Sequence, residues 1–239
     1  MTVRDIYDFL NEKAPFSTAE AWDNPGLLVG DPRREVTRVL TVLDIIPEAI
    51  EAAQRLGAQL IVSHHPVIFS PLRRLEASSV PYALARADIA AICAHTNLDR
   101  AEGGVNDTLA ALLGLGNVRP LADGLCRVGV LPDPLPPEIF AEQVARRLDT
   151  AVRLTAGEQP VSKVALCSGA GGDYFSACAG EADAFVTGEI KHHEWLEAAE
   201  SGLTVVEAGH YATEIAAADT LSSWLTVRLP SLISLSFHG

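Results

Sequence analysis

The chain of 239 residues is long enough for one large domain or two small ones, with a core that needs no disulfide bonds. Apolar residues make up 48% of the chain and charged residues 21%, an ordinary balance that excludes a disordered, fibrous or low-complexity protein. The net charge of −13 at pH 7 would repel phosphates, so nucleic acid is not expected as the main partner.

The sequence also lacks the signals of membrane insertion and export. No apolar run approaches the roughly 18 residues needed to cross a bilayer, and residues 1–5 lack the basic and then apolar character of a secretory signal. We therefore expect a cytoplasmic protein with no membrane partner. The four cysteines form no C-x-x-C motif and are expected to be reduced and packed.

The first elements along the chain are a helix and a turn. Ile6, Phe9 and Leu10 recur at helical spacing behind Thr2, which can cap that helix. The turn cluster Trp22-Asp23-Asn24-Pro25-Gly26 follows, and a short strand is predicted after it over residues 27–29.

An α/β pattern then begins and occurs twice. Residues 39–43 are typical of a buried strand, 47–56 of a helix with proline in its first turn, and 59–63 of a second buried strand. When Arg38 is laid on Lys163, an offset of 125 residues places this βαβ unit on a second one that ends near residue 188. A further strand follows each unit and leads to His-x-x-x-acid: His95 with Asp99, and His210 with Glu214.

We therefore expect an α/β protein made of two related α/β domains, with mixed sheets flanked by helices and a metal site at strand carboxyl ends between the domains. The predicted domains are residues 1–125 and 126–239, joined near the proline-rich segment 131–137. Whether the C-terminal segment packs back on the first domain stays open.

The sharpest local feature is the strand that ends in His64-His65-Pro66. Its two imidazoles lie at the carboxyl end, the edge where open α/β sheets hold their ligands. Neighbouring strand residues point to opposite faces, so both rings serve one site only if the chain bends there, which Pro66 favours. A structural or surface role is the competing interpretation.

The two His-x-x-x-acid motifs have competing interpretations as well. Asp99 can be an oxygen ligand near the imidazoles, but a turn or helix-capping role is favoured when the motif stands alone. His210 and Glu214 lie one helical turn apart if the following alanine-rich helix extends back to His210, a spacing that suits chelation. A solvated helix start, with Glu214 near the positive end of the helix dipole, is the alternative.

The combination favours a metal. If Asp99 and Glu214 approach within about 4 Å, their repulsion is on the order of 4 kcal/mol at an effective dielectric of 20, and a cation removes it. Three histidines and two carboxylates at strand ends suit Zn, Fe, Mn or Co. Because five ligands exceed the need of one catalytic zinc, we expect two divalent ions that share a bridging carboxylate.

These residues carry a family resemblance that spans nearly the whole chain. The motifs that carry it are Trp22-Asp23-Asn24-x-Gly26-Leu27-x-Val29-Gly30, Ser63-His64-His65-Pro66, His95-Thr96-Asn97-x-Asp99, Gly103-Gly104-Val105-Asn106-Asp107, Thr187-Gly188-Glu189 with His193, and Gly209-His210-x-x-x-Glu214. With these motifs the sequence resembles the Nif-three-like dinuclear metal-centre proteins, known as GTP cyclohydrolase 1 type 2 homologues. At 239 residues it resembles the short form of this family, which has no central insert.

The resemblance implies a two-domain subunit that forms a ring-shaped homohexamer with metal sites facing an inner cavity. The ligands that it implies for two divalent transition-metal ions per subunit are His64, His65, Asp99, His210 and Glu214, with Glu214 as the bridge. Two departures weaken any site role of Glu189 or Lys191, because the family often has Asp where Glu189 stands and Tyr where His192 stands.

The leading hypothesis is a dinuclear-metal-dependent hydrolase in which a metal-bridged water is the nucleophile. His95 and His193 are the candidates for moving protons, against simple packing for His95 and a plain surface position for His193. The resemblance implies a small-molecule substrate, a nucleotide such as GTP. A noncatalytic metal-binding regulatory or sensor assembly is the alternative, and an iron pair acting on O2 is a third. The glycine-rich segment 168–172 is a candidate phosphate loop, although a structural turn is favoured.

Overall fold

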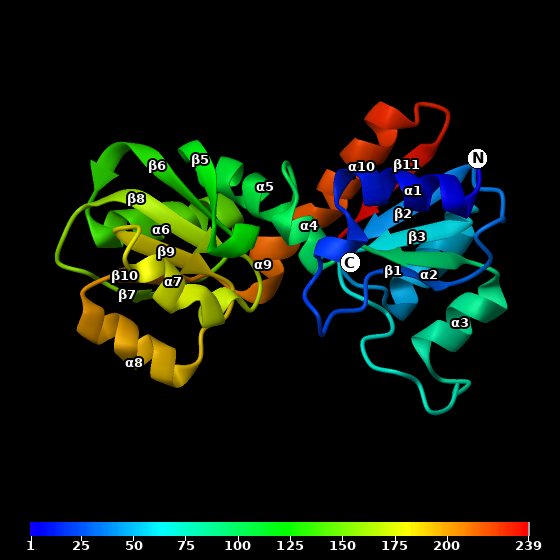
Figure 1. Ribbon diagram of the computed structural model, residues 1–239, viewed down its shortest axis with the longest axis horizontal. Helices are drawn as coiled ribbons and strands as arrows, with labels where there is room; N and C mark the ends of the chain where they lie inside the picture. Colours follow the sequence, from blue (N-terminus) through cyan, green and yellow to red (C-terminus); the bar gives the residue numbers. More distant parts are fainter. Residues whose placement is uncertain (239) are drawn as a thin grey trace. The chain divides into compact units, whose positions relative to one another are not determined.

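The computed structural model describes residues 1–238, which form two compact units (Figure 1). Unit 1 comprises Met1–Glu102 and the described residues from Ile215 onward, and unit 2 comprises Gly103–Glu214. This division differs from the boundary expected at residues 125 and 126. The difference arises because residues 103–125 belong with the second sheet and the chain returns to the first sheet after Glu214.

Unit 1 is built on a five-stranded sheet in the order β1-β4-β3-β2-β11. Its elements are α1 (Val3–Lys13), η1 (Phe16–Thr18), β1 (Gly26–Val29), β2 (Arg38–Val42), α2 (Pro47–Leu56), β3 (Leu60–Ser63), α3 (Val80–Ala87), β4 (Ala90–Cys93), α4 (Thr96–Arg100), α10 (Ala216–Arg228) and β11 (Ile233–Phe237). Only β1 runs antiparallel to its neighbour. Strands β3 and β4 are buried along their whole length, as expected for parallel strands with both faces covered.

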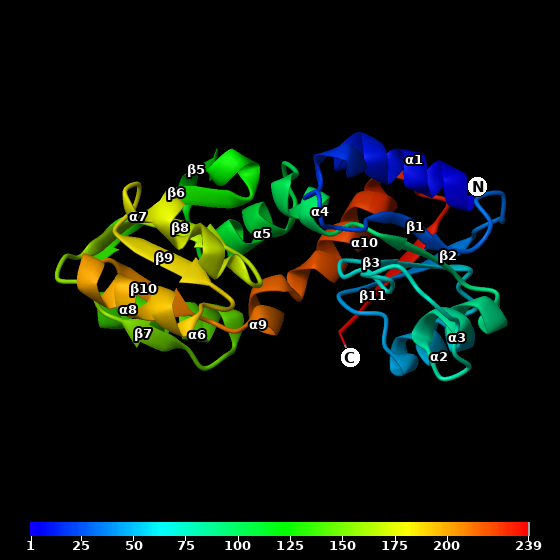
Figure 2. The same cartoon turned by 60° about the horizontal axis from the view of Figure 1, so that its bottom comes forward.

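Helices cover both faces of this sheet. Helices α2 and α3 lie side by side on one face, where Ile50 and Leu84 pack against Leu40 and Ile61 (Figures 1 and 2). Helices α1 and α10 lie on the other face. The predicted cap of α1 is confirmed: Thr2 Oγ1 accepts from the Asp5 N–H, and the Asp5 carboxylate accepts from the Thr2 N–H.

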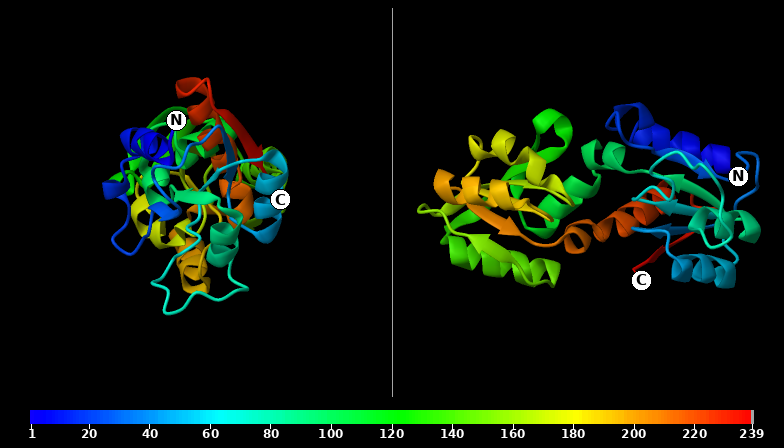
Figure 3. Two further views of the ribbon diagram at one scale, coloured as in Figure 1. Left: turned by 90° about the vertical axis from the view of Figure 1, so that its right-hand side faces the viewer. Right: turned by 90° about the horizontal axis from the view of Figure 1, so that it is seen from below.

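The C-terminal segment belongs to unit 1. Strand β11, red in Figure 3, pairs in parallel with β2 from Ile233 opposite Arg38 to Phe237 opposite Val42. The preceding helix α10 packs on β2 and β11. The possibility left open by the sequence, a return of the chain to the first sheet, is the observed arrangement.

Unit 2 is built on a six-stranded mixed sheet in the order β5-β6-β8-β9-β10-β7. Its elements are α5 (Val105–Leu112), β5 (Gly116–Leu121), η2 (Ala122–Gly124), β6 (Cys126–Leu135), α6 (Pro137–Leu148), β7 (Arg153–Thr155), β8 (Val161–Cys167), η3 (Gly171–Tyr174), α7 (Phe175–Ala179), β9 (Ala184–Thr187), α8 (His192–Ser201), β10 (Thr204–Glu207) and α9 (His210–Glu214). Strands β8, β9 and β10 are parallel, and the remaining pairs are antiparallel.

Alternate residues of the central strands fill two cores in unit 2. Val164 and Leu166 of β8 pack with α5 and α6, whereas Ala165 and Cys167 pack with α7 and α8. All four cysteines are buried and free, which confirms the expectation of reduced, packed thiols. Burial raises the pKa of the Cys93 thiol, which keeps it protonated.

The proline-rich segment is part of a strand instead of a joint between domains. Residues 131–135 belong to β6, where the pairing with β8 is irregular between Val130 and Leu135. Pro132 and Pro134 lie within this irregular stretch, where a missing N–H removes no ladder hydrogen bond.

The two sheets repeat one topology. Three parallel strands, β2-β3-β4 and β8-β9-β10, form the centre of each, and an antiparallel edge strand, β1 or β7, pairs with the third. A short helix follows each third strand, α4 after β4 and α9 after β10. The prediction of two related α/β domains with mixed sheets flanked by helices is thus confirmed. No helix among residues 1–238 has the length and apolar character needed to cross a bilayer.

Candidate metal centre

His64 and His65 follow the carboxyl end of β3, and the chain bends there as predicted. The strand ends at Ser63, whose hydroxyl donates to the His65 carbonyl oxygen over 2.7 Å. The His64 and His65 N–H groups still donate to Val42 and Leu43 of the neighbouring segment. The two ring centroids lie 5.1 Å apart, so both imidazoles serve the same site.

His95 completes a cluster of three imidazoles in unit 1. Its ring centroid lies 5.3 Å from that of His64 and 5.5 Å from that of His65. One nitrogen of each ring lies within 4.8 Å of the other two, close enough for the group to hold a metal ion. His64 is completely buried, and His65 and His95 are partly buried.

Asp99 lies beside this cluster, and the N-cap positions of α4 and α5 are taken by His95 and Gly104. It is part of α4, its side chain is 13% exposed, and its Oδ1 lies 3.6 Å from His64 Nε2. Near the start of α5, the Gly103 N–H donates a hydrogen bond to Asp107 Oδ2 over 2.7 Å. The oxygen-ligand interpretation of Asp99 therefore fits its position, and the capping interpretation does not.

The Nδ1 atom of each imidazole in this cluster contacts an oxygen. His64 Nδ1 lies 2.9 Å from the Ala94 carbonyl oxygen, His65 Nδ1 lies 2.8 Å from Asp44 Oδ1, and His95 Nδ1 lies 2.8 Å from Asp23 Oδ1. These oxygens can only accept a hydrogen bond, so Nδ1 carries the proton and Nε2 keeps its lone pair. Histidines that ligate metals are held in this way by a second partner.

The Asp23 carboxylate accepts hydrogen bonds from Thr96 as well as from His95. Its side chain is fully buried, and Oδ2 accepts from both the N–H and the hydroxyl of Thr96. Burial alone would raise the pKa of Asp23, but the hydrogen bonds from His95 and Thr96 outweigh it and lower the pKa to about 2. Asp23 is therefore an ionised anchor for His95.

In unit 2, His210 and Glu214 form the predicted pair across one turn of α9. His210 Nε2 lies 2.9 Å from Glu214 Oε2. The Glu214 side chain is 5% exposed and lies at the last position of α9, which does not fit a solvated helix start. Glu189, just after β9, lies with Oε1 3.1 Å from His210 Nδ1, so each nitrogen of this imidazole faces a carboxylate.

The glycine-rich segment packs closely under α9. Gly169 has a φ of +58°, its N–H donates to Thr213 Oγ1 over 3.0 Å, and its carbonyl oxygen accepts from the Glu189 N–H. A Cβ at Gly169 would overlap the Glu214 carboxylate and lie 3.2 Å from His210 Nε2. Glycine is needed here so that the loop can approach the His210 and Glu214 pair, which favours the structural interpretation over a phosphate loop.

His193 lies apart from these anchored groups. It is near the start of α8, its side chain is 75% exposed, and its nearest carboxylate is Glu194 at 4.0 Å. Its surroundings resemble the surface position considered from the sequence.

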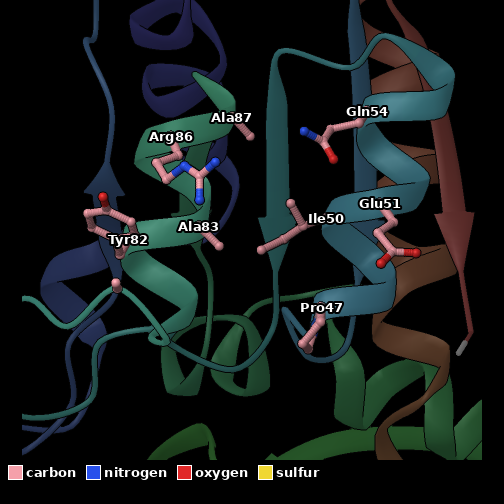
Figure 4. Close-up of a pocket in the computed structure, with 9 residues that line it drawn as sticks. Pro47, Ile50, Glu51, Gln54, Tyr82, Ala83, Arg86 and Ala87 are labelled. Atoms are coloured by element: carbon pink, nitrogen blue, oxygen red, sulfur yellow. The ribbon is translucent and has the colours of Figure 1, made fainter.

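A hollow of about 290 Å³ lies elsewhere in unit 1, between α2 and α3 (Figure 4). Ile50 from α2 and Ala83 from α3 point into it, with Tyr82, Arg86 and Gln54 at its rim. None of the residues singled out from the sequence as ligands or proton carriers lines it.

The comparisons with known proteins give the same family as the sequence motifs. The sequence model of the family described as Duf34/NIF3 (NGG1p interacting factor 3) matches residues 1–238. The chain belongs to this family. Curated proteins that are similar to this Duf34/NIF3 chain carry the name GTP cyclohydrolase 1 type 2 homolog.

Two of those relatives illustrate the likeness. The protein of Streptomyces coelicolor is 39% identical over 229 residues, which cover 88% of this chain and 80% of the relative. The protein of Methanocaldococcus jannaschii is 34% identical over 248 residues, 99% of this chain and all of the relative.

Solved structures confirm the Duf34/NIF3 fold. A Staphylococcus aureus protein of 30% identity superposes with a TM-score of 0.92 and covers 99% of this chain and 96% of its own. Reduced HcgD from Methanocaldococcus jannaschii, 32% identical, superposes with a TM-score of 0.85 over 99% of this chain and 97% of its own. Within this fold, unit 1 carries a histidine group able to bind a metal ion.

Proposed function

We propose that this Duf34/NIF3 protein is a dinuclear-metal-dependent hydrolase. Two divalent transition-metal ions per subunit, Zn, Fe, Mn or Co, would be held by His64, His65 and Asp99 of unit 1 and by His210 and Glu214 of unit 2, with Glu214 as the bridge. The observation that carries this proposal is the oxygen acceptor found at the Nδ1 of His64 and His65. It leaves the Nε2 lone pair of each of these two rings available for a metal ion.

The donor chemistry supports a metal of this class. Neutral imidazoles and carboxylates suit borderline transition metals, whereas a closed structural zinc site uses thiolates and a calcium site uses oxygen alone. All four cysteines are free and buried within the cores, and the described imidazoles that are anchored lie next to strand ends. When bound, such ions supply Lewis acidity and bring the pKa of water to about 7.

His95 is the residue best placed to move the proton. Asp23 holds its Nδ1 and fixes its ring beside His64 and His65, so that Nε2 can accept the proton of the attacking water and return it to the leaving group. The ionised Asp23 carboxylate also stabilises the imidazolium formed between the two transfers. We retain His193 as a second proton carrier to be tested, although its exposed position gives it no such anchor.

The names of the relatives support a nucleotide such as GTP as the substrate. The resemblance further supports a ring-shaped homohexamer, located in the cytoplasm. Light scattering tests the assembly: we expect a mass of six subunits, and the mass of a monomer would overturn the homohexamer.

Elemental analysis and a turnover screen test the hydrolase itself. We expect about two transition-metal ions per chain in the wild type, and a lower content in both His65→Ala and His210→Ala if one centre takes donors from both units. Turnover should be sought on nucleotides and phosphoesters with the metal-loaded protein. A wild type that carries its metal and hydrolyses none of them would overturn the hydrolase and support the metal sensor.

Three variants locate the chemistry. His95→Asn should lose at least about 100-fold in turnover and keep the metal content if His95 carries protons. A loss of metal in this variant would show instead that His95 is a ligand, as a member of the three-histidine group. His193→Asn is the matched histidine variant and loses turnover only if this residue also carries protons. Turnover that survives in Glu214→Gln would exclude the proposed bridge.

A further inference from the structure

Two exposed aromatic side chains pack together beside the imidazole cluster of unit 1, and one of them, Trp22, contacts that cluster. The ring centroids of Trp22 and Phe69 are 5.8 Å apart with an angle of 37° between the planes. Trp22 also meets His95 edge to face, with ring centroids 6.0 Å apart. Trp22 is 56% exposed and Phe69 is 52% exposed, so a large aromatic surface faces solvent directly beside His95.

The polar neighbours of Trp22 hold this pair in place. Asp23, the next residue, anchors His95, and Asn24 donates from Nδ2 to the Ile68 carbonyl oxygen over 2.6 Å. One short turn therefore fixes the indole next to His95 and also fixes the segment that carries Phe69. The pair is built into the site and is not a loose hydrophobic contact of a surface loop.

We propose that Trp22 and Phe69 form a stacking surface that binds the planar heteroaromatic ring of a small-molecule ligand. Aromatic faces attract another ring through stacking, which favours a flat base over an aliphatic or sugar group. Because Trp22 meets His95 edge to face, a ring stacked on the indole would lie close to His95. The occupant is therefore the molecule on which His95 acts, an inference that rests on the proposed hydrolase function.

We compare the affinities of the protein for guanosine 5′-monophosphate and for ribose 5-phosphate. The two probes differ in the base, so the difference in affinity measures the contribution of the ring. Tryptophan emission reports contact with the indole. The chain has three tryptophans, so the double variant Trp195→Phe, Trp224→Phe keeps Trp22 alone as the emitter. We expect the nucleotide to quench this emission and ribose 5-phosphate to leave it unchanged.

Calorimetric titration of both probes then tests the side chains. Trp22→Leu and Phe69→Leu should each weaken nucleotide binding by about 5- to 100-fold and leave ribose 5-phosphate binding unchanged. Phe69→Tyr keeps a ring and should bind like the wild type. Trp224→Phe is the control in the same unit, since its ring lies near Lys13 in a different contact. Thermal unfolding checks that each variant is folded.

Several results would overturn the stacking surface: no measurable nucleotide binding by the wild type, equal binding of both probes, or unchanged selectivity in Trp22→Leu and Phe69→Leu. A loss of subunit association in these variants, with unchanged selectivity, would show instead that the pair contacts a second copy of the chain. Binding and quenching need no turnover. Ring-selective binding without hydrolysis would therefore remove the hydrolase alone, and hydrolysis that is indifferent to Trp22 and Phe69 would remove the stacking surface alone.

Discussion

Gly169→Ala tests whether the glycine-rich segment serves the His210 and Glu214 pair. An alanine Cβ at this position would lie 2.8 Å from Glu214 Cδ and 3.2 Å from His210 Nε2. Carbon atoms rest at about 3.5–4.0 Å, so the Glu214 carboxyl group must retreat by roughly 0.7–1.2 Å. Metal–ligand distances tolerate about 0.2 Å, so this displacement removes Glu214 as an effective ligand.

Two separate losses are therefore expected in Gly169→Ala. The left-handed backbone, with a φ of +58°, costs an alanine about 1–2 kcal/mol, which lowers the free energy of unfolding by that amount. Displacement of Glu214 lowers metal affinity by at least about 10- to 100-fold, the range seen when even indirect partners of a metal are removed.

Competition with a chromophoric chelator measures the metal affinity, and urea unfolding of metal-free protein measures the stability. Gly202→Ala is the matched control in unit 2, because Gly202 has a φ of +74° and a Cβ there meets no atom within 4 Å. It should lose similar stability and no metal affinity. A Gly169→Ala protein with metal affinity within twofold of the wild type would refute the steric reasoning, as would an equal loss of affinity in Gly202→Ala.

Three further perturbations have outcomes set by single contacts. Because the folded pKa of Asp23 lies near 2, below its usual 3.8, its ionisation stabilises the wild type above about pH 4, and this increment disappears as the pH falls toward 2. Asp23→Asn should therefore be less stable by about 1–2 kcal/mol at pH 5, and the gap in urea unfolding should narrow toward pH 2; a constant gap would exclude this linkage. Glu189→Ala should weaken metal binding about 10-fold in chelator competition, because His210 Nδ1 loses its acceptor, and unchanged affinity would show that the contact is dispensable. Thr2→Ala should lower the free energy of unfolding by about 1 kcal/mol through the lost cap of α1, and a change below about 0.3 kcal/mol would count against the cap.

The central α/β pattern could be predicted from the sequence because buried strands and helices have simple sequence patterns. The predicted strand 39–43, helix 47–56 and strand 59–63 correspond to β2, α2 and β3 within one residue at each end. Strands covered on both faces are continuous apolar runs, and α2 has proline at its start and Gly57 in a left-handed conformation at its end. Local signals of this strength survive any tertiary context.

The pairing of strands distant in sequence could not be predicted from such local patterns. The C-terminal β11 has a half-exposed pattern, and its place beside β2 depends on the register across most of the chain. The prolines of segment 131–137 favoured a linker, but the irregular pairing of β6 tolerates them. The sequence left open whether the alanine-rich helix extends back to His210; the structure has two helices there, α9 and α10, divided at Ile215, whose own backbone angles remain helical. The places of β11 and β6 are decided by strand partners distant in sequence.

Two of the carboxylates that contact the histidines, Asp44 and Glu189, could have been predicted from the sequence. Asp44 and Glu189 each stand two residues after a buried parallel strand, β2 and β9, and the carboxyl ends of such strands carry the ligands of α/β sheets. That rule places both beside the histidines without any structure. Asp23 precedes its strand, and it reaches the same edge only because β1 runs antiparallel to β4, with Gly26 opposite Cys93 at the end of β4. Strand direction at an edge is set by pairing, so Asp23, the buried anchor of His95, was the one that the sequence could not place.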